Sequence, residues 1–356
     1  MKFNKEDKVI LIIILLVSII SIVFTLFNEN FYKKDIMKIN SIEIKDSEIS
    51  TNPYNFKEKY TKKIIKGTII NNKNKGLKKE ITYEESYSSI VTEKYKVGDK
   101  VFVSNDDIDG LKRDTYIVSI ICLFILLMYL LGKIRGLITV LTVSINSIIF
   151  YLLLELYFKG MNLLLLCLIE SIIFTIVSLL ISSGKNRKTM SAIISTIVST
   201  IILLFMNFII IKITDYKGTN FNELSFLTVP FEDVFLCSIM MGGLGAIMDV
   251  AISISSSLAE LIEKDKNISN KSLIKSGKAI GKDILGTMMN VLFFTYLCSG
   301  LPIFVLALRN GFSISNYINN NFNLEITRFL TGSIGIVMTI PISIFISIKL
   351  LKKEAK

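Results

Sequence analysis

The sequence predicts an all-α polytopic membrane protein of about eight transmembrane helices, with a small β-rich extracytoplasmic domain between helices 1 and 2. Hydrophobic residues make up 51% of the 356 residues. They are clustered into runs of about 20 residues, the length that a helix needs to cross roughly 30 Å of hydrocarbon. Charged residues and Asn fill the gaps, and Lys and Arg gather in alternate loops, as is typical of membrane proteins.

The first apolar run spans about residues 9 to 27 and follows Lys2, Lys5 and Lys8. A secretory signal peptide would have a shorter apolar stretch and a small-x-small cleavage site after it, and this segment has neither. Residues 1–27 are therefore expected to form a retained N-terminal membrane anchor helix.

Residues 28–114 are polar and charged, and they contain no apolar run long enough to cross a membrane. Short stretches of strand-like composition recur at 41–44, 63–70, 80–83, 89–91 and 100–103. Turn sequences, such as 71–76 and 97–99, separate some of them. Strands joined by such turns predict a small β-barrel or β-sandwich domain.

Residues 115–350 are predicted to form a seven-helix bundle, followed by a cytoplasmic tail at 351–356. With a cytoplasmic N-terminus, the loops rich in Lys and Arg all fall on the inner side of the membrane. Both termini are therefore expected in the cytoplasm and the 28–114 domain outside the cell membrane. The abundance of Lys, Ile and Asn is typical of a low-GC bacterium. The expected spans cover residues 115–132, 137–158, 162–182, 190–213, 234–258, 284–308 and 327–348.

The segment 264–282 has two interpretations. Lys271, Lys275, Lys278 and Lys282 recur at helical spacing, and apolar residues face the other way. One interpretation is an amphipathic helix that lies in the headgroup region with its lysines near anionic lipid. The other is a solvated linker between two spans.

The composition also limits the function classes. The net charge of +11 comes largely from loops beside helix ends, so nucleic acid is not an expected partner. The sequence has no His, and its four cysteines lie in apolar runs without a CxxC pattern. A metal site, a cofactor and a disulfide are therefore not expected. An enzyme is not expected either, because intramembrane proteases need paired aspartates, a Ser with a base or a metal motif.

The most informative polar residue is Asp249, in the span 234–258. A carboxylate at mid-bilayer costs on the order of 2.5–3.5 kcal/mol by insertion scales, so it needs a functional or a structural reason. Asn290 is expected at about the same depth, where an Asp–Asn pair would hold a proton or a cation. The alternative is that such groups only lock helices together. The face of the Asp249 helix collects Gly242, Gly245, Asp249, Ser253, Ser256 and Glu260.

Other polar and small residues in the expected spans also carry predictions. Glu170 is a second mid-membrane acid with apolar neighbours, so it either pairs across helices or stays protonated. Glu325 and Arg328 are three residues apart, and they are expected to form a structural ion pair near the outer boundary. Five glycines of the last three spans are expected to mediate helix packing, and they are Gly242, Gly245, Gly286, Gly332 and Gly335.

These residues also carry a family resemblance. The blocks 242–260, 281–290 and 325–335, the last continuing to Pro341, occur in the order typical of the YibE/F-like multipass membrane proteins of bacteria, which this sequence resembles. The stretches 132–136 and 97–101 also fit, so the resemblance covers most of the chain. It departs at Val291, where the family is expected to have Thr, and the outer domain matches loosely. The resemblance implies an architecture but no activity.

Two function hypotheses follow. The leading one is a transporter or permease-like protein that uses Asp249, with Asn290 and Ser253, as a site for protons, ions or a small solute in the lipid bilayer. The alternative is a non-transporting envelope-assembly or protein-export accessory protein that binds an envelope protein through residues 28–114. Its layout is similar to that of SecD/SecF-type export proteins, although the number of spans differs.

Overall fold

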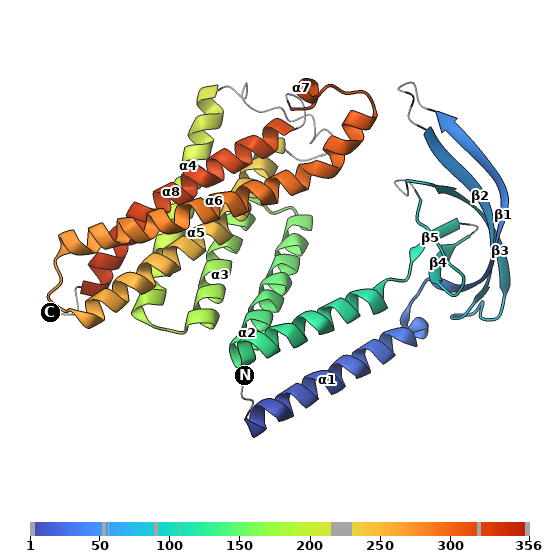
Figure 1. Cartoon of the computed structure of the whole chain (residues 1–356), viewed down its shortest axis with the longest axis horizontal. Coiled ribbons are helices and arrows are strands. Elements are labelled where there is room, and N and C mark those ends of the chain that lie inside the picture. Colours follow the sequence, from blue (N-terminus) through green and yellow to red (C-terminus); the bar gives the residue numbers. More distant parts are fainter. Residues whose placement is uncertain are drawn as a thin grey trace. The chain divides into compact units, whose positions relative to one another are not determined.

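The computed structural model describes residues 4–51, 55, 57–88, 92–105, 107–214, 230–318 and 322–352. This part of the chain consists mainly of long helices, with one small antiparallel sheet near the N-terminus (Figure 1). The chain forms two compact units, Met1–Leu137 and Ile138–Lys356.

The first unit contains the sheet and the helical segments that flank it. The strand order is β3-β2-β1-β4-β5, and every neighbouring pair is antiparallel. The β-rich domain expected between the first two spans is therefore present. The elements of the first unit are α1 (Lys5–Leu26), the 3-10 turn η1 (Glu29–Phe31), β1 (Asp35–Thr51), β2 (Lys57–Ile69), β3 (Lys78–Ser86), β4 (Lys100–Ser104), β5 (Asp107–Leu111) and the first part of α2 (Asp114–Phe158).

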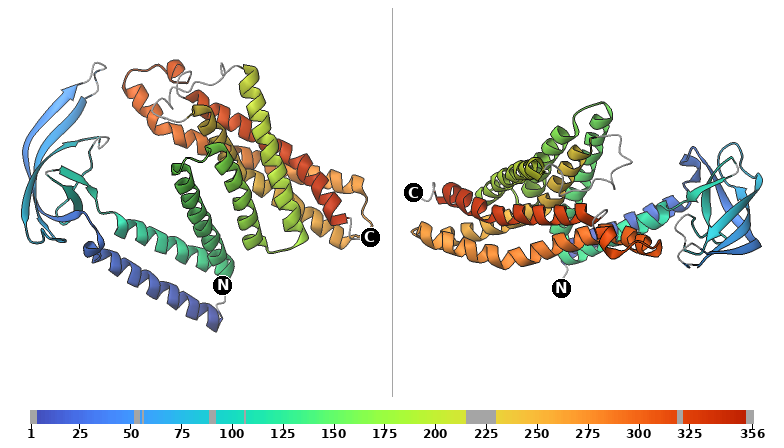
Figure 2. Two further views of the ribbon diagram at one scale, coloured as in Figure 1. Left: turned by 180° about the vertical axis from the view of Figure 1, so that it is seen from behind. Right: turned by 90° about the horizontal axis from the view of Figure 1, so that it is seen from above.

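The sheet encloses its own small core. Side chains of β1 to β4 that point to one face form a buried cluster with Tyr95, which precedes β4. The strand members are Met37, Ile39, Ile65, Ile81, Val101 and Val103. The edge strands β3 and β5 approach each other, so the sheet curls toward a barrel (Figure 2). All five described strands belong to this one sheet, so the sandwich alternative is wrong.

Two lysines fasten the sheet to the end of α1. Lys112, whose side chain is only 2% exposed, donates to the Thr25 carbonyl oxygen at 2.6 Å and to Asp114 at 2.8 Å. Lys100 donates to the Leu26 carbonyl oxygen at 2.6 Å and forms an ion pair with Glu29. The last carbonyls of a helix lack intrahelical partners and attract positive charge, so both ammonium groups stabilise the end of α1.

The pKa of Glu29 shows the effect of its ion pair with Lys100. Burial disfavours its charged form, but hydrogen bonding and the charge of Lys100 outweigh burial, so the pKa of Glu29 lies below its ordinary value. The carboxylate thus remains charged beside Lys100 at neutral pH.

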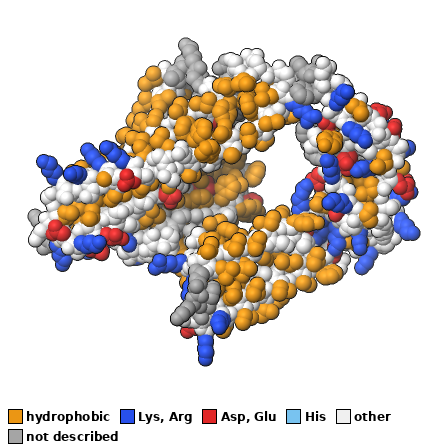
Figure 3. All heavy atoms as spheres, viewed as in Figure 1, with side chains coloured by type: hydrophobic (Ala, Val, Ile, Leu, Met, Phe, Trp, Pro, Cys, Tyr) orange, Lys and Arg blue, Asp and Glu red, His pale blue; other side chains and the backbone are white. Residues whose placement is uncertain are grey.

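The expected spans correspond to long apolar helices. Seven described helices are long and apolar enough to cross a membrane. One of them, α2, has 45 residues and is interrupted at Lys133 by non-helical backbone (φ 49°, ψ −133°), so it supplies the two spans predicted at 115–132 and 137–158. Hydrophobic side chains cover the middle of the helices, and charged ones gather on the sheet and at helix ends (Figure 3).

The second unit has α4, α5 and α8 at its centre. Small residues let these helices approach closely: Leu203 of α4 fits against Gly243 of α5 and Gly335 of α8, where an added Cβ would lie 3.2 and 3.0 Å from its methyl groups. Such contacts are typical of helix association in membranes. The helices of this unit are the rest of α2, α3 (Leu163–Ser183), α4 (Arg187–Thr214), α5 (Phe231–Lys264), α6 (Asn270–Arg309), α7 (Ile314–Tyr317) and α8 (Asn323–Lys352).

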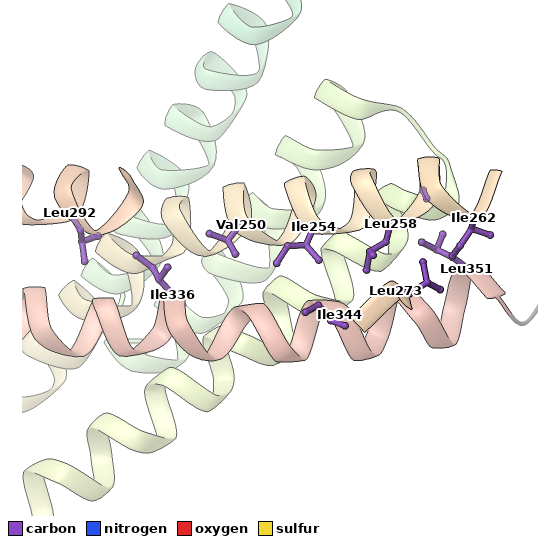
Figure 4. Packing of buried hydrophobic residues seen from close by; sticks show 10 residues of the cluster. Val250, Ile254, Leu258, Ile262, Leu273, Leu292, Ile336, Ile344 and Leu351 are labelled. Atoms are coloured by element: carbon purple, nitrogen blue, oxygen red, sulfur yellow. The ribbon is translucent and has the colours of Figure 1, made fainter. Parts of the chain in front are cut away.

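Helices α6 and α8 also pack through glycines. An added Cβ at Gly281 would lie 2.6 Å from Ile340, and one at Gly332 would lie 2.6 Å from Leu292. The glycines therefore form sockets for branched side chains of the facing helix. Figure 4 shows the buried cluster that joins α5, α6 and α8, including Val250, Leu292 and Ile336.

From Asn270 onward the segment 264–282 is helical with exposed lysines, as its first interpretation expects, but it is not a separate helix. Helix α5 runs to Lys264, and Asn270 already begins α6, which continues without a break into the next expected span. Leu273 is fully buried, and Gly277 lies against Ile344 of α8. Part of the apolar face of this segment therefore packs on α8, because Leu273, Gly277 and Gly281 extend the α8-packing face by helical spacing.

A glycine-to-alanine pair on α6 tests this packing. Gly281→Ala is expected to lower the free energy of unfolding by about 1–3 kcal/mol, because the new methyl group overlaps the stiff β-branched Ile340. Gly286→Ala is the matched control, since no atom lies within 4 Å of its added Cβ and alanine favours a helix by about 1 kcal/mol. Thermal unfolding in detergent, followed by circular dichroism, measures both. Equal melting temperatures for the two variants would contradict the close contact.

Candidate functional site

The two sides of α5 have different environments. One side is buried against α4, α6 and α8 and includes Ile247, Val250 and Ile254. Asp249 and Gly245 lie on the other side, and both are exposed. The packing of α5 thus leaves the Asp249 carboxylate outside the buried core of the second unit.

Asn290 lies at the level of Asp249. Gly242 of α5 meets Tyr296 of α6, where an added Cβ would lie 2.1 Å from the tyrosine oxygen. Asp249 lies about two turns beyond this contact on α5, and Asn290 lies nearly two turns before it on the antiparallel α6. The similar depth expected for the two residues agrees with this geometry. No hydrogen bond joins them in the part of the chain that the structure describes.

Two residues of α5 and two of α6 at similar depth are exposed. They are Gly245, Asp249, Gly286 and Asn290, and we call them the Asp249 strip. An added Cβ at Gly245 or Gly286 would meet no described atom within 4 Å. These two glycines therefore do not make the helix contacts expected of them, because they lie on the open side of their helices. Ser253, one turn along α5 from Asp249, is partly buried.

Glu170 lies inside the second unit. It is 3% exposed on α3, and its Oε1 atom has no hydrogen-bond partner among the described residues. A charged carboxylate in such surroundings is costly without a partner. The structure therefore gives no cross-helix ion pair to Glu170, and protonation remains the alternative from the sequence.

Glu325 and Arg328 form an ion pair on α8, with both side chains nearly buried. Arg328 also donates from Nε to the Ser238 hydroxyl of α5 at 3.0 Å, and its guanidinium group lies 5.6 Å from the centre of the Phe235 ring. The pair therefore ties α8 to α5. Glu325 Oε2 and the nearby Tyr296 hydroxyl have no partner among the described groups.

A buried row of hydroxyl groups was missed by the sequence reasoning. Ser191, Ser255 and Ser347 come from α4, α5 and α8, and their oxygen atoms lie 2.9 to 3.4 Å apart. The signal was Ser or Thr at every fourth position of two helices, which places them on one face. We call this row the hydroxyl seam, and it contains Ser191, Ser195, Ser199, Ser255, Thr339, Ser343 and Ser347.

Only some hydroxyl groups of the hydroxyl seam have a hydrogen-bond partner among the described residues. Thr339 donates to the Gly335 carbonyl oxygen at 2.7 Å, but Ser195, Ser199 and Ser343 have no hydrogen-bond partner within the described ranges. A buried polar group without a partner costs about 1–3 kcal/mol. The seam is therefore the most polar stretch of the buried core between α4, α5 and α8.

The acids are dispersed rather than clustered. Over the residues that the structure describes, no three His, Cys, Asp or Glu side chains come together in a way that would hold a metal ion. Any chemistry in the described part of the bundle would therefore depend on single carboxylates, each in different surroundings.

The ion pair gives a stability prediction. Arg328→Met is expected to lower the free energy of unfolding by about 3 kcal/mol, because it leaves the Glu325 carboxylate buried without a counter-charge. The double variant Glu325→Gln with Arg328→Met should recover at least half of that loss. Unfolding by SDS in mixed micelles measures the free energies of wild type, the two single variants and the double variant. Additive losses in the double variant would show that the two residues are independent.

Comparison with known proteins assigns the family. Residues 120–353 match the family described as YibE/F-like protein, and residues 30–120 match the YibE/F family N-terminal domain. No curated protein and no solved structure matches the chain. The two matches together cover the sheet domain and the helical bundle that carries Asp249. The chain therefore belongs to the YibE/F-like family.

Proposed function

We propose that this protein is a transporter or permease-like protein of the bacterial cell membrane, with Asp249 at the centre of a site for protons, ions or a small solute. Seven helices of sufficient length and hydropathy support insertion in a membrane. The observation that carries the proposal is the Asp249 strip. It combines an acid at the middle of an apolar helix with no hydrogen-bond partner among the described residues.

The surroundings of Asp249 are suited to reversible binding of a proton, an ion or a small solute. An intramembrane acid that only stabilises a bundle is normally paired within it, as Glu325 is with Arg328. Asp249 instead has an amide, Asn290, at its own level and a hydroxyl, Ser253, one turn away. These groups would share the solvation of a proton or cation. Glu170 is a second acid for the same role, deeper in the unit.

The proposed orientation places both termini in the cytoplasm and the sheet domain outside. The turn between α5 and α6 and the end of α8 lie together, since Lys352 donates to the Ile268 carbonyl oxygen at 2.6 Å. This end of the bundle carries many lysines, among them Lys264, Lys271 and Lys349. Such clusters favour the cytoplasmic side.

Flux measurements test the role of Asp249. In proteoliposomes with an imposed pH or cation gradient, Asp249→Asn is expected to reduce flux at least about tenfold, because it removes the charge and the proton-binding group. Asp283→Asn is the matched control, since Asp283 is exposed near the lysine-rich end of α6. Equal flux for wild type and Asp249→Asn would contradict the role of this residue.

A second candidate function rests on the sheet domain, as an envelope-assembly or protein-export accessory. β1 pairs with β4 only over Asp35–Lys38, whereas it pairs with β2 as far as Thr51. The part of β1 after Lys38 therefore has one edge that no described strand pairs with. In this part of β1, Ile44 (70%) and Ile49 (66%) are exposed. An edge of this kind accepts an extended segment of another protein.

Photo-crosslinking tests this second candidate. A crosslinker at Ile44 or Ile49 is expected to capture a discrete envelope protein in cells, and Asp249→Asn should leave the capture unchanged. Leu77 is the control position, because it is also exposed (54%) but lies outside the strands. Equal labelling at Leu77 would count against a partner on β1.

A further inference from the structure

A groove lies between the first turns of α6 and the last turns of α8. It has a volume of about 480 Å³, within the range of small-molecule sites. Its floor is apolar and its rim carries two lysines; the residues that matter are Ile274, Lys278, Pro341, Phe345, Ile348 and Lys349. The groove is therefore amphipathic, and each of the two helices contributes at least one apolar residue and one lysine.

The apolar floor of the groove is exposed. Phe345 is 68% exposed and Ile274 is 41% exposed, although both lie beside the closely packed contact of Gly277 with Ile344. Exposed large apolar side chains in one groove indicate an apolar occupant. The groove lies at the end of the span expected in α8 (327–348) and beside the turns of α6 that precede its expected span (284–308). It would therefore meet the boundary between headgroups and acyl chains.

The charge on the rim is all of one sign. Lys278 and Lys349 are exposed, and neither forms an ion pair with a described acidic residue. No Asp or Glu lines the groove. Asn270, the first residue of α6, also lines it, so the positive end of the α6 dipole adds to the two ammonium groups. The polar part of the occupant must therefore be an anion.

We propose that this groove binds an anionic phospholipid, with its phosphate between Lys278 and Lys349 and an acyl chain against Phe345 and Ile274. Charge complementarity selects the headgroup, and the apolar floor selects a lipid over a free anion. The lipid would contact α6 and α8 together, next to the glycine sockets that join them.

Two charge-matched double variants test the proposal. Lys278→Gln with Lys349→Gln removes the rim charge, whereas Lys271→Gln with Lys275→Gln removes equal charge from exposed positions of α6 outside the groove. Native mass spectrometry of the full-length protein in detergent, titrated with phosphatidylglycerol or phosphatidylcholine, measures binding. The groove variant is expected to bind phosphatidylglycerol roughly 30-fold more weakly than wild type, and the control variant to stay within about twofold.

Further measurements identify the occupant. Phe345→Ala should weaken phosphatidylglycerol binding without changing the preference for an anionic headgroup, and millimolar inorganic phosphate should not displace the lipid. Unchanged melting temperatures will show that each variant is folded. Equal losses in the two double variants, equal binding of phosphatidylcholine, displacement by phosphate, or a dimer that replaces the lipid at this groove would each overturn the proposal.

Discussion

The close approach of α4, α5 and α8 is the constraint on which the rest of the bundle depends. In a bilayer, burial of apolar surface does not drive helices together, so association relies on shape, small residues and interhelical hydrogen bonds. Leu203 against Gly243 and Gly335 supplies the shape, and the buried serines of three helices supply the hydrogen bonds. Because these contacts use one side of α5, they fix Asp249 on the other side. The position of the candidate site is thus a consequence of packing.

The long apolar helices could be predicted from the sequence because helix length and hydropathy are local properties. The packing face of α5 could not. Residues 242–256 carry small residues on more than one side of the helix: Gly243 and Ser255 are buried, whereas Gly245 is exposed. The sequence alone does not show which side is buried. The choice depends on which face complements α4 and α8, which is information held outside the segment. The depth of Asn290 followed from residue counting alone, but a hydrogen bond to Asp249 needs side-chain direction, which counting does not give.

The sheet domain shows the same division between local and distant information. Strand-like stretches at 41–44, 63–70, 80–83 and 100–103 fall in or overlap described strands, although β1 extends much further because β2 pairs with it to Thr51; the stretch 89–91 lies outside the described residues. Lys100 and Lys112 look like ordinary surface charges in the sequence. Their role depends on the carbonyl groups of α1, which lie 74 and 87 residues earlier in the chain. Strand-like composition and turn sequences predict that strands exist, but they cannot predict hydrogen bonds between residues so far apart in the chain.

The interruption at Lys133 has a consequence for biosynthesis. Asp7 accepts hydrogen bonds from Lys133 and, through its carbonyl oxygen, from Tyr129, while Lys112 holds the other end of α1. These contacts all join residues within 7–133, which lie in the first unit of the chain. Domains generally fold as units and in order from the N-terminus during translation. Helix α1 and the sheet can therefore fold while the helices that carry Asp249 and Asn290 are still being made.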